Sequence, residues 1–201
     1  MRAVVLARSI RGDDDMKRLI LICLLLTGCS SGPWQSMRTG AMYPNLNRNS
    51  QCVLDTQTQT YEVGQVVLVT IEGVETARRI AAVAGERVDM VDGVITRNGN
   101  KVSQSSIRKR VMCHIGVNAR CTCRISKETL GTRTYRVQQL VPPDLDGDAR
   151  CEPQYPDVTD LLIPKGHVFL TADNRDGALD SRIVGPLPLE KVLGRVERCR
   201  Y

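Results

Sequence analysis

Short apolar runs separated by glycine, proline and polar turns make up most of this chain beyond residue 38. Residues 64–69 and 161–170 are two such runs, and residues 130–137 alternate between apolar and polar positions. Runs of β-branched residues with this punctuation are typical of strands. The sequence offers no convincing amphipathic helix and no internal repeat. We therefore predict a mainly β domain with strands at these three positions.

Turn signals and polar stretches indicate how the strands are connected. Asp92-Gly93 and Asn98-Gly99 predict two hairpin turns. Residues 101–124 are polar, basic and rich in cysteine, and we expect a loop stapled by disulfides. Residues 142–156 hold several prolines and closely spaced aspartates, which predict a turn. The aspartates do not form an EF-hand loop, because Gly147 comes at the fourth position rather than the sixth.

The N-terminal part has the order of an export signal. A basic start at Met16-Lys17-Arg18 is followed by an apolar run at residues 19–26, which is too short to span a bilayer that needs ~20 residues. Leu26-Thr27-Gly28-Cys29 then resembles the lipobox of bacterial lipoproteins, in which the cysteine carries lipid. The alternative is an ordinary signal peptide that happens to contain Cys29.

This signal divides the chain into three parts. Residues 1–28 are expected to be the signal, 29–38 a tether and 39–201 the folded domain. Residues 1–15, with three consecutive aspartates, fit no secretory signal, so we expect translation to start at Met16. A lipid anchor on Cys29 predicts a membrane-anchored protein on the periplasmic, extracytoplasmic face. Ser30 gives no retention signal of the aspartate type, which favours the outer membrane.

Composition and charge narrow the function classes. Aromatic residues make up only 3% of the chain, so the core must rely on aliphatic residues and crosslinks. The formal net charge is +6, yet the chain has no long Lys/Arg run and no basic residues interleaved with aromatics. Nucleic-acid binding is therefore not expected, whereas mild attraction to an anionic membrane is.

The cysteines predict disulfides. Of eight cysteines, Cys23 and Cys29 fall within or at the end of the signal, which leaves six. An even number in an exported chain argues for disulfide bonds, with fifteen possible pairings. The six candidates are Cys52, Cys113, Cys121, Cys123, Cys151 and Cys199. A zinc cluster of Cys113, His114, Cys121 and Cys123 is the alternative, but its C-x-C spacing departs from the usual pattern. We expect no metal and no cofactor.

The most charged stretch of the domain is residues 173–182, which follow the apolar run at 161–170. Three aspartates and two arginines lie within it. Arginine forks among carboxylates form charge-assisted bidentate pairs that hold a loop rigid. The simpler alternative is a solvated, charged turn.

The order of these residues resembles the last conserved box of type I signal peptidases, Ser/Lys enzymes that remove leader peptides. Asp173-Asn174-Arg175-Asp176 and Asp180-Ser181-Arg182 carry this resemblance. Residues 39–46 resemble the nucleophile box of that family, and residues 75–88 resemble the box with the general-base lysine. The resemblance covers residues 39–196. It implies a fold of coiled antiparallel β-sheets and, as the partner, an extended leader-like peptide or a preprotein.

The resemblance also implies roles for single positions. Ala41 stands where the family has its nucleophilic serine, and Thr39 stands at the oxyanion-hole hydroxyl. Arg78 replaces the general-base lysine, and Ala178 replaces the serine that orients it. The residues expected to be retained as the scaffold of the site are Met42, Pro44, Arg79, Asp173, Asn174, Arg175, Asp180, Ser181 and Arg182. An alanine cannot attack a carbonyl and an arginine cannot act as a base, so the chemistry is expected to be lost.

Three hypotheses follow for the function. The first is an inert signal-peptidase homologue that binds leader-like peptides at a sheet edge or scaffolds a secretion or conjugation apparatus. The second is an active peptidase with a displaced hydroxyl and a base from elsewhere. Its candidates are Thr39, Ser36 and Ser181, with Lys101 or Lys165 as the base. The third is a structural envelope lipoprotein that binds no peptide. The oligomeric state stays open.

Overall fold

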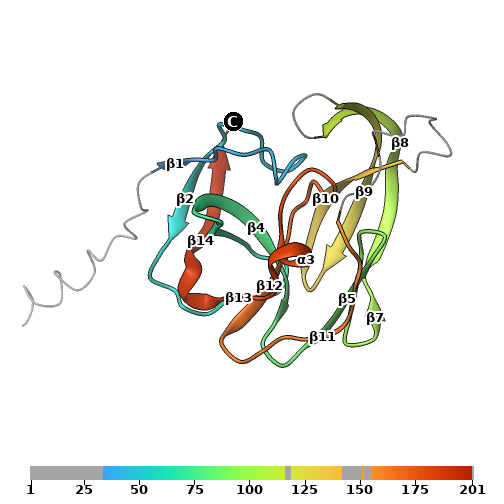
Figure 1. The fold of residues 1–201 in the computed structure, drawn as a ribbon. Coiled ribbons are helices and arrows are strands. Elements are labelled where there is room, and N and C mark those ends of the chain that lie inside the picture. Colours follow the sequence, from blue (N-terminus) through green and yellow to red (C-terminus); the bar gives the residue numbers. More distant parts are fainter. Residues whose placement is uncertain (1–33, 116–118, 142–150, 152–154, 201) are drawn as a thin grey trace, which may run out of the picture. The chain divides into compact units, whose positions relative to one another are not determined.

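The computed structural model describes residues 34–115, 119–141, 151 and 155–200 (Figure 1). The strands are β1 (Trp34–Ser36), β2 (Gln51–Asp55), β3 (Val66–Ile71), β4 (Val74–Val83), β5 (Arg87–Val91), β6 (Val94–Arg97), β7 (Asn100–Lys101), β8 (Ser103–Ile115), β9 (Ala119–Leu130), β10 (Arg133–Leu140), β11 (Val158–Leu162), β12 (His167–Thr171), β13 (Leu187–Pro188) and β14 (Val192–Arg200). The described helices are α3 (Ser181–Val184) and the 3₁₀ turn η1 (Leu189–Lys191). The prediction of a mainly β fold is confirmed.

Antiparallel pairing builds three sheets from these strands. The largest has the order β1-β2-β14-β3-β4-β12-β13. A three-stranded sheet has the order β10-β9-β8, and a four-stranded sheet has the order β11-β5-β6-β7. The first and last described strands, β1 and β14, lie in the same sheet on either side of β2 (Figure 1).

The core is aliphatic, as the low aromatic content requires. One cluster packs Val67 and Val69 of β3 against Ile80 of β4 and Leu170 of β12. A second cluster surrounds Phe169, the only phenylalanine of the chain. Alternate residues of a strand point to opposite faces, so β12 contributes to both clusters. Burial on both faces fixes the position of the loop that follows β12.

The apolar run at residues 161–170 is not one strand. It forms the end of β11 and most of β12, which belong to different sheets. Pro164 has no N–H for a ladder, and Gly166 has φ of 77°, a conformation that suits glycine. A turn closes there, with the His167 N–H donating to the Pro164 carbonyl at 3.1 Å. The single-strand prediction is therefore wrong.

Residues 101–124 are not a loop either. Residues 103–115 of this stretch form β8 and its residues 119–124 begin β9, and these two strands pair antiparallel. In β9 the buried positions alternate and include Cys121, Cys123 and Ile125. The cysteines therefore take the place of apolar residues in a strand whose other face is polar, and this explains why the stretch reads as a loop. Asp92-Gly93 and Asn98-Gly99 join β5 to β6 and β6 to β7, so both predicted hairpin turns are confirmed.

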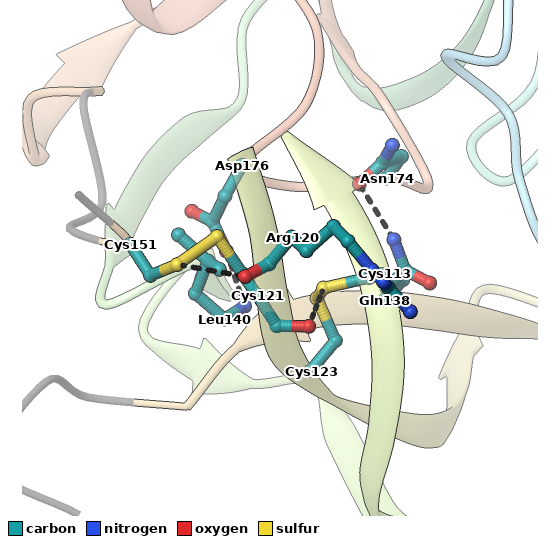
Figure 2. The surroundings of a disulfide bond; sticks show 9 residues. All are labelled: Cys113, Arg120, Cys121, Cys123, Gln138, Leu140, Cys151, Asn174 and Asp176. Atoms are coloured by element: carbon teal, nitrogen blue, oxygen red, sulfur yellow. Dashed lines mark hydrogen bonds between the residues drawn. A yellow bond between two sulfur atoms is a disulfide. The ribbon is translucent and has the colours of Figure 1, made fainter. Parts of the chain in front are cut away.

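All six predicted cysteines form disulfides. Cys52 pairs with Cys199 and joins β2 to β14. The other two bonds, Cys113–Cys123 and Cys121–Cys151, lie side by side at the β8–β9 hairpin (Figure 2). The disulfide prediction is confirmed and the pairing is resolved. The zinc alternative is wrong, because three of its sulfurs are consumed in disulfide bonds.

The N-terminal predictions fall largely outside the described residues. The signal at residues 1–28, the Met16 start and the lipidation site Cys29 belong to this part. The predicted tether at 29–38 contains β1, which pairs with β2. The aspartates of residues 142–150 also lie outside. In the part of the chain that the structure describes, no helix has the length and apolar character needed to cross a membrane.

Candidate functional site

The loop after β12 lies against residues 39–46, the stretch that contains the expected nucleophile position. Ala41 is buried, and its carbonyl oxygen accepts a hydrogen bond from the Asn174 N–H at 2.9 Å. Met42, the next residue, packs in the core against Leu68 and Ala77. Residues 39–46 and 173–182, distant in sequence, therefore meet at one place.

Arg78 has a buried guanidinium whose hydrogen bonds all go to neutral oxygens. Its Nε and Nη2 donate to the Leu179 carbonyl at 2.8 and 2.5 Å. Its Nη1 donates to Thr76 Oγ1 and to the Ala77 carbonyl, both at 2.6 Å. Burial lowers the pKa of Arg78 to about 10, against the opposing charge of Asp180. The group therefore stays protonated at neutral pH.

Thr39 is connected to Arg78 through a second threonine. Its Oγ1 lies 3.0 Å from Thr76 Oγ1, which also accepts a hydrogen bond from Arg78 Nη1. Since the Thr76 oxygen receives that bond, its own hydroxyl proton is free to point to Thr39. No basic nitrogen touches Thr39 directly in the described residues. Through Thr76, the Thr39 hydroxyl is therefore connected to a protonated guanidinium and not to a base.

The other candidate hydroxyls lie apart. Ser181 is 1% exposed, and its Oγ accepts a bond from the Leu170 N–H at 2.9 Å. Ser36 is exposed on β1. Lys101 ends β7 in the four-stranded sheet, and Lys165 lies in the turn before β12; both are exposed. Within the described part of the chain, neither lysine hydrogen-bonds to a candidate hydroxyl.

Arg79 and Asp173 form a buried bidentate pair. Nε donates to Oδ1 at 2.8 Å and Nη2 to Oδ2 at 2.6 Å, with the side chains 6% and 0% exposed. The Tyr135 ring covers this guanidinium at 3.6 Å. Burial alone would lower the pKa of Arg79, but the Asp173 carboxylate outweighs burial and raises it. The pair ties β4 to the start of the charged loop.

Arg175 reaches a carboxylate that the sequence did not single out. Its Nη2 donates to Glu128 at 2.5 Å, and both side chains are fully buried. Glu128 also accepts bonds from the Tyr135 hydroxyl and from Gln104. The alternation of buried positions at Cys121, Cys123 and Ile125 changes phase at Ser126, so it does not mark Glu128 as buried.

Arg182 and Asp180 close the far end of the charged loop. The guanidinium donates to both carboxylate oxygens at 2.9 Å, and the Asp180 carboxylate also accepts the Ala172 N–H at 3.0 Å. Arg182 Nη2 donates to the Arg175 carbonyl as well. Three buried arginine–carboxylate pairs thus hold residues 173–182 in one conformation, which rules out a solvated turn. Ala178, beside Leu179, is half-buried.

The disulfide cluster supports this loop from the side of β10. Gln138 Nε2 donates to Asn174 Oδ1 at 3.2 Å, and the Leu140 N–H donates to Asp176 at 2.7 Å (Figure 2). Leu140 pairs with Cys123 in the β9–β10 ladder. Burial raises the pKa of Asp176, against its bond from Leu140. Sequence reasoning missed Gln138, for which no local signal exists.

One side of β4 beside Arg78 has no paired strand, and of the residues on that side Glu75 is exposed whereas Ala77 is buried. β3 pairs with β4 from Val74 to Arg79, whereas β12 pairs with it only from Arg79 to Val83. Ile80 points its backbone groups toward the β3 side, where it bonds to Gly64 and Gln65. Because direction alternates along a strand, Glu75 and Ala77 point theirs to the open side. Among the described residues, no strand pairs with that side of residues 74–78.

The comparisons with known proteins identify the family. The model described as "Signal peptidase, peptidase S26" matches residues 15–201. Short stretches match thylakoidal processing peptidase 1 of Arabidopsis thaliana (43% identity over 44 residues) and mitochondrial inner membrane protease subunit 1 of Xenopus tropicalis (50% over 34 residues). These matches cover 22% and 17% of this chain, but only 13% and 20% of the relatives' lengths.

A solved structure was also found. It is the crystal structure of a signal peptidase I from Enterococcus faecalis, with 16% identity and a TM-score of 0.39. The match covers 69% of this chain and 97% of the other. With the family model spanning nearly the whole sequence, this chain belongs to the signal peptidase family, peptidase S26.

Proposed function

We propose that this chain is a catalytically inactive signal peptidase homologue that binds leader-like extended peptides, and that it serves a secretion or conjugation apparatus as a binding or scaffold protein. The observation that carries the proposal is the buried guanidinium of Arg78, which donates to the carbonyls of Leu179 and Ala77 and to Thr76. A lysine amine in a buried site loses its proton near neutrality, whereas this guanidinium keeps it.

The residues at two other catalytic positions, Ala41 and Ala178, support the same conclusion. Ala41 offers a methyl group where an attacking hydroxyl is required, and Ala178 offers no hydroxyl to orient a base. Losing one member of a catalytic triad typically costs ~10⁴- to 10⁶-fold in kcat. Three such losses leave only binding and electrostatic contributions to the rate.

A displaced nucleophile has less support. Thr39 is hydrogen-bonded to Thr76, which accepts a hydrogen bond from the protonated Arg78. The Ser181 hydroxyl oxygen accepts a hydrogen bond from the Leu170 N–H. An active Thr39 would need a neutral amine within reach, and the exposed side chains of Lys101 and Lys165 form no hydrogen bond to it in the described structure.

The open edge of β4 supports peptide binding. An extended peptide adds to such an edge through main-chain hydrogen bonds, while side-chain pockets give specificity. The exposed Glu75 offers its N–H group to that peptide, and the buried Ala77 has its N–H group on the same side. The Ala77 carbonyl already accepts Arg78 Nη1 at 2.6 Å, so the arginine takes an acceptor that a peptide would otherwise use. Binding is therefore expected to be weaker than at a free edge.

Hydrogen exchange tests this mode residue by residue. A synthetic leader peptide that extends several residues beyond its small-residue cleavage motif is titrated into the purified protein, and amide exchange is followed by NMR. We expect slowed exchange at Glu75 and Ala77, because their N–H groups gain partners. The amides of Thr76 and Arg78 face β3 and serve as internal controls, since their exchange should not change.

Three outcomes decide the proposal. Protection confined to Glu75 and Ala77, with the peptide intact by mass spectrometry, supports it. A cleaved peptide would contradict the loss of activity. An unchanged exchange pattern at saturating peptide would contradict the binding and favour a purely structural envelope protein.

The location is part of the same proposal. We infer that Cys29 carries lipid and holds the domain on the periplasmic face of a membrane, with the outer membrane favoured. Mass spectrometry of the protein expressed in a bacterial host should show a mature chain that begins at Cys29 with an added acyl mass. A chain of unmodified mass, or one cut elsewhere, would contradict the anchor; Cys29→Ser is the matched control.

A further inference from the structure

The only tryptophan of the chain lies on a sheet face beside two arginines of β14. Trp34 of β1 pairs with Val53 of β2, which pairs in turn with Arg198 of β14. Residues opposite each other in a sheet share a face, so Trp34 and Arg198 lie on either side of Val53. Figure 1 shows β1, β2 and β14 side by side in that order. We call Trp34, Arg198 and Arg200 the Trp34 surface.

Both arginines contact the indole. The Arg200 guanidinium carbon lies 4.3 Å from the ring centroid of Trp34 and that of Arg198 lies 5.7 Å away. Trp34 is nevertheless 40% exposed, and both arginines are exposed. A guanidinium stacked on a ring keeps its N–H edge free for another partner. The surface therefore combines an open aromatic face with two sets of outward donors.

No carboxylate neutralises these two charges within the described structure. In the same strand a different arginine, Arg195, pairs with Asp55 at 2.8 Å and with Glu197 at 3.9 Å. Arg198 and Arg200 have no salt bridge among the described residues. Two unpaired guanidinium groups next to an exposed indole attract an anion that also offers apolar surface.

We propose that the Trp34 surface binds the headgroup region of an anionic phospholipid bilayer. Tryptophan favours the membrane–water interface because one end of its ring system is apolar and the other carries an N–H donor. Arginine binds phosphate through paired N–H donors. A bilayer supplies both chemistries at once, and a free phosphate supplies only the second.

Membrane contact at this surface does not depend on peptide binding at β4, nor on lipid at Cys29. If Cys29 is acylated, Trp34 follows it by five positions, a reach of about 17 Å when fully extended. The anchor would then hold the Trp34 surface close to the bilayer throughout.

Fluorescence of the sole tryptophan reports directly on this contact. The full chain carrying Cys29→Ser is mixed with phosphatidylglycerol vesicles, with phosphatidylcholine vesicles or with inorganic phosphate. We expect a larger blue shift, and stronger quenching by brominated lipid, with phosphatidylglycerol than with phosphatidylcholine. Each basic residue near an anionic surface contributes roughly fivefold to affinity, so Arg198→Ala with Arg200→Ala should weaken binding about twenty-five-fold.

A matched double variant controls for total charge. Arg108→Ala with Lys109→Ala removes the same two charges from β8 of another sheet, and its vesicle affinity should change less than threefold. Because the apolar N-terminal segment is present in every variant, its own membrane affinity cancels in the comparison. Far-UV circular dichroism confirms that each variant is folded.

The proposal is overturned if the two double variants lose affinity equally. It is also overturned if phosphatidylcholine gives the same blue shift as phosphatidylglycerol, or if inorganic phosphate alone gives the full response. Trp34→Ala should weaken vesicle binding by a factor similar to that of the double arginine variant, and vesicle sedimentation measures this change. Unchanged sedimentation of that variant would remove the indole from the contact.

Discussion

The carbonyl oxygen of Leu179 accepts hydrogen bonds from both Nε and Nη2 of Arg78, at 2.8 and 2.5 Å. The two residues are 101 positions apart, so this contact ties β4 to the charged loop after β12. An arginine fits here because its fork satisfies several neutral oxygens at once without needing to lose its proton. In this chain the position links two parts of the site and supplies no base.

The buried pair of Arg79 and Asp173 should stabilise the fold strongly. Asp173→Asn leaves the Arg79 guanidinium, 6% exposed, without its counter-charge. Removing one partner of a buried pair typically costs ~3–5 kcal/mol of unfolding free energy. Urea unfolding of wild type and variant measures this difference.

The exposed pair of Arg87 and Asp160 is the matched control for that variant. Its side chains are 55% and 80% exposed, so Asp160→Asn makes the same chemical change in water. It should cost less than ~1 kcal/mol. Equal losses in the two variants would show that burial does not set the strength of the Asp173 contact.

The disulfides should differ in their contributions according to the loops they close. Cys52–Cys199 joins residues 147 positions apart, and Cys113–Cys123 joins residues 10 apart. In the chain-entropy account these loops correspond to about 5 and about 3 kcal/mol. Paired Cys→Ser variants, unfolded in urea, should therefore rank Cys52→Ser with Cys199→Ser as the less stable. The reverse order would contradict an entropic origin.

Acid should destabilise the protein through Glu128. Burial opposes ionisation of this carboxyl, but the charge of Arg175 together with hydrogen bonds from Tyr135, Gln104 and Arg175 outweighs burial, and the pKa is lowered from 4.5. A lowered pKa in the folded state means that the carboxylate stabilises the fold above pH 4.5. This contribution is lost as the pH falls through the folded-state value.

Glu128→Gln removes that titration. Its unfolding free energy should fall less steeply below pH 4.5 than that of the wild type, although it is lower at pH 7 because Arg175 loses a charged partner. Glu190→Gln, at an exposed position, should leave the acid slope unchanged. A wild-type slope in Glu128→Gln would exclude this carboxyl as the source of acid sensitivity.

Local sequence patterns predicted two hairpin turns and the rigid charged loop at residues 173–182. The turns at Asp92-Gly93 and Asn98-Gly99 follow from glycine in a left-handed conformation, and the rigid charged loop follows from its dense arginines and carboxylates. The β8–β9 hairpin was missed because cysteines occupy its buried positions. A cysteine in a polar stretch can be recognised as a buried strand position only when its partner strand is known.

Long-range partners were beyond sequence reasoning for a different reason. Glu128 and Gln138 reach the loop at residues 173–182 through sheet register, which no local pattern encodes. The same holds for the disulfide pairing, since Cys52 meets Cys199 only because β2 and β14 are neighbours in the sheet. The six cysteines alone permit fifteen pairings.

Restoring the lost groups tests the central claim most directly. The triple variant Ala41→Ser, Arg78→Lys and Ala178→Ser is incubated with a signal-peptide-bearing preprotein beside the wild type, and products are identified by mass spectrometry. The buried site should lower the pKa of the new lysine amine toward neutrality, as it lowers that of Arg78, so cleavage should rise with pH. We predict no cleavage by the wild type and cleavage at the leader junction by the triple variant. Cleavage by the wild type would contradict the account and direct the search to Thr39.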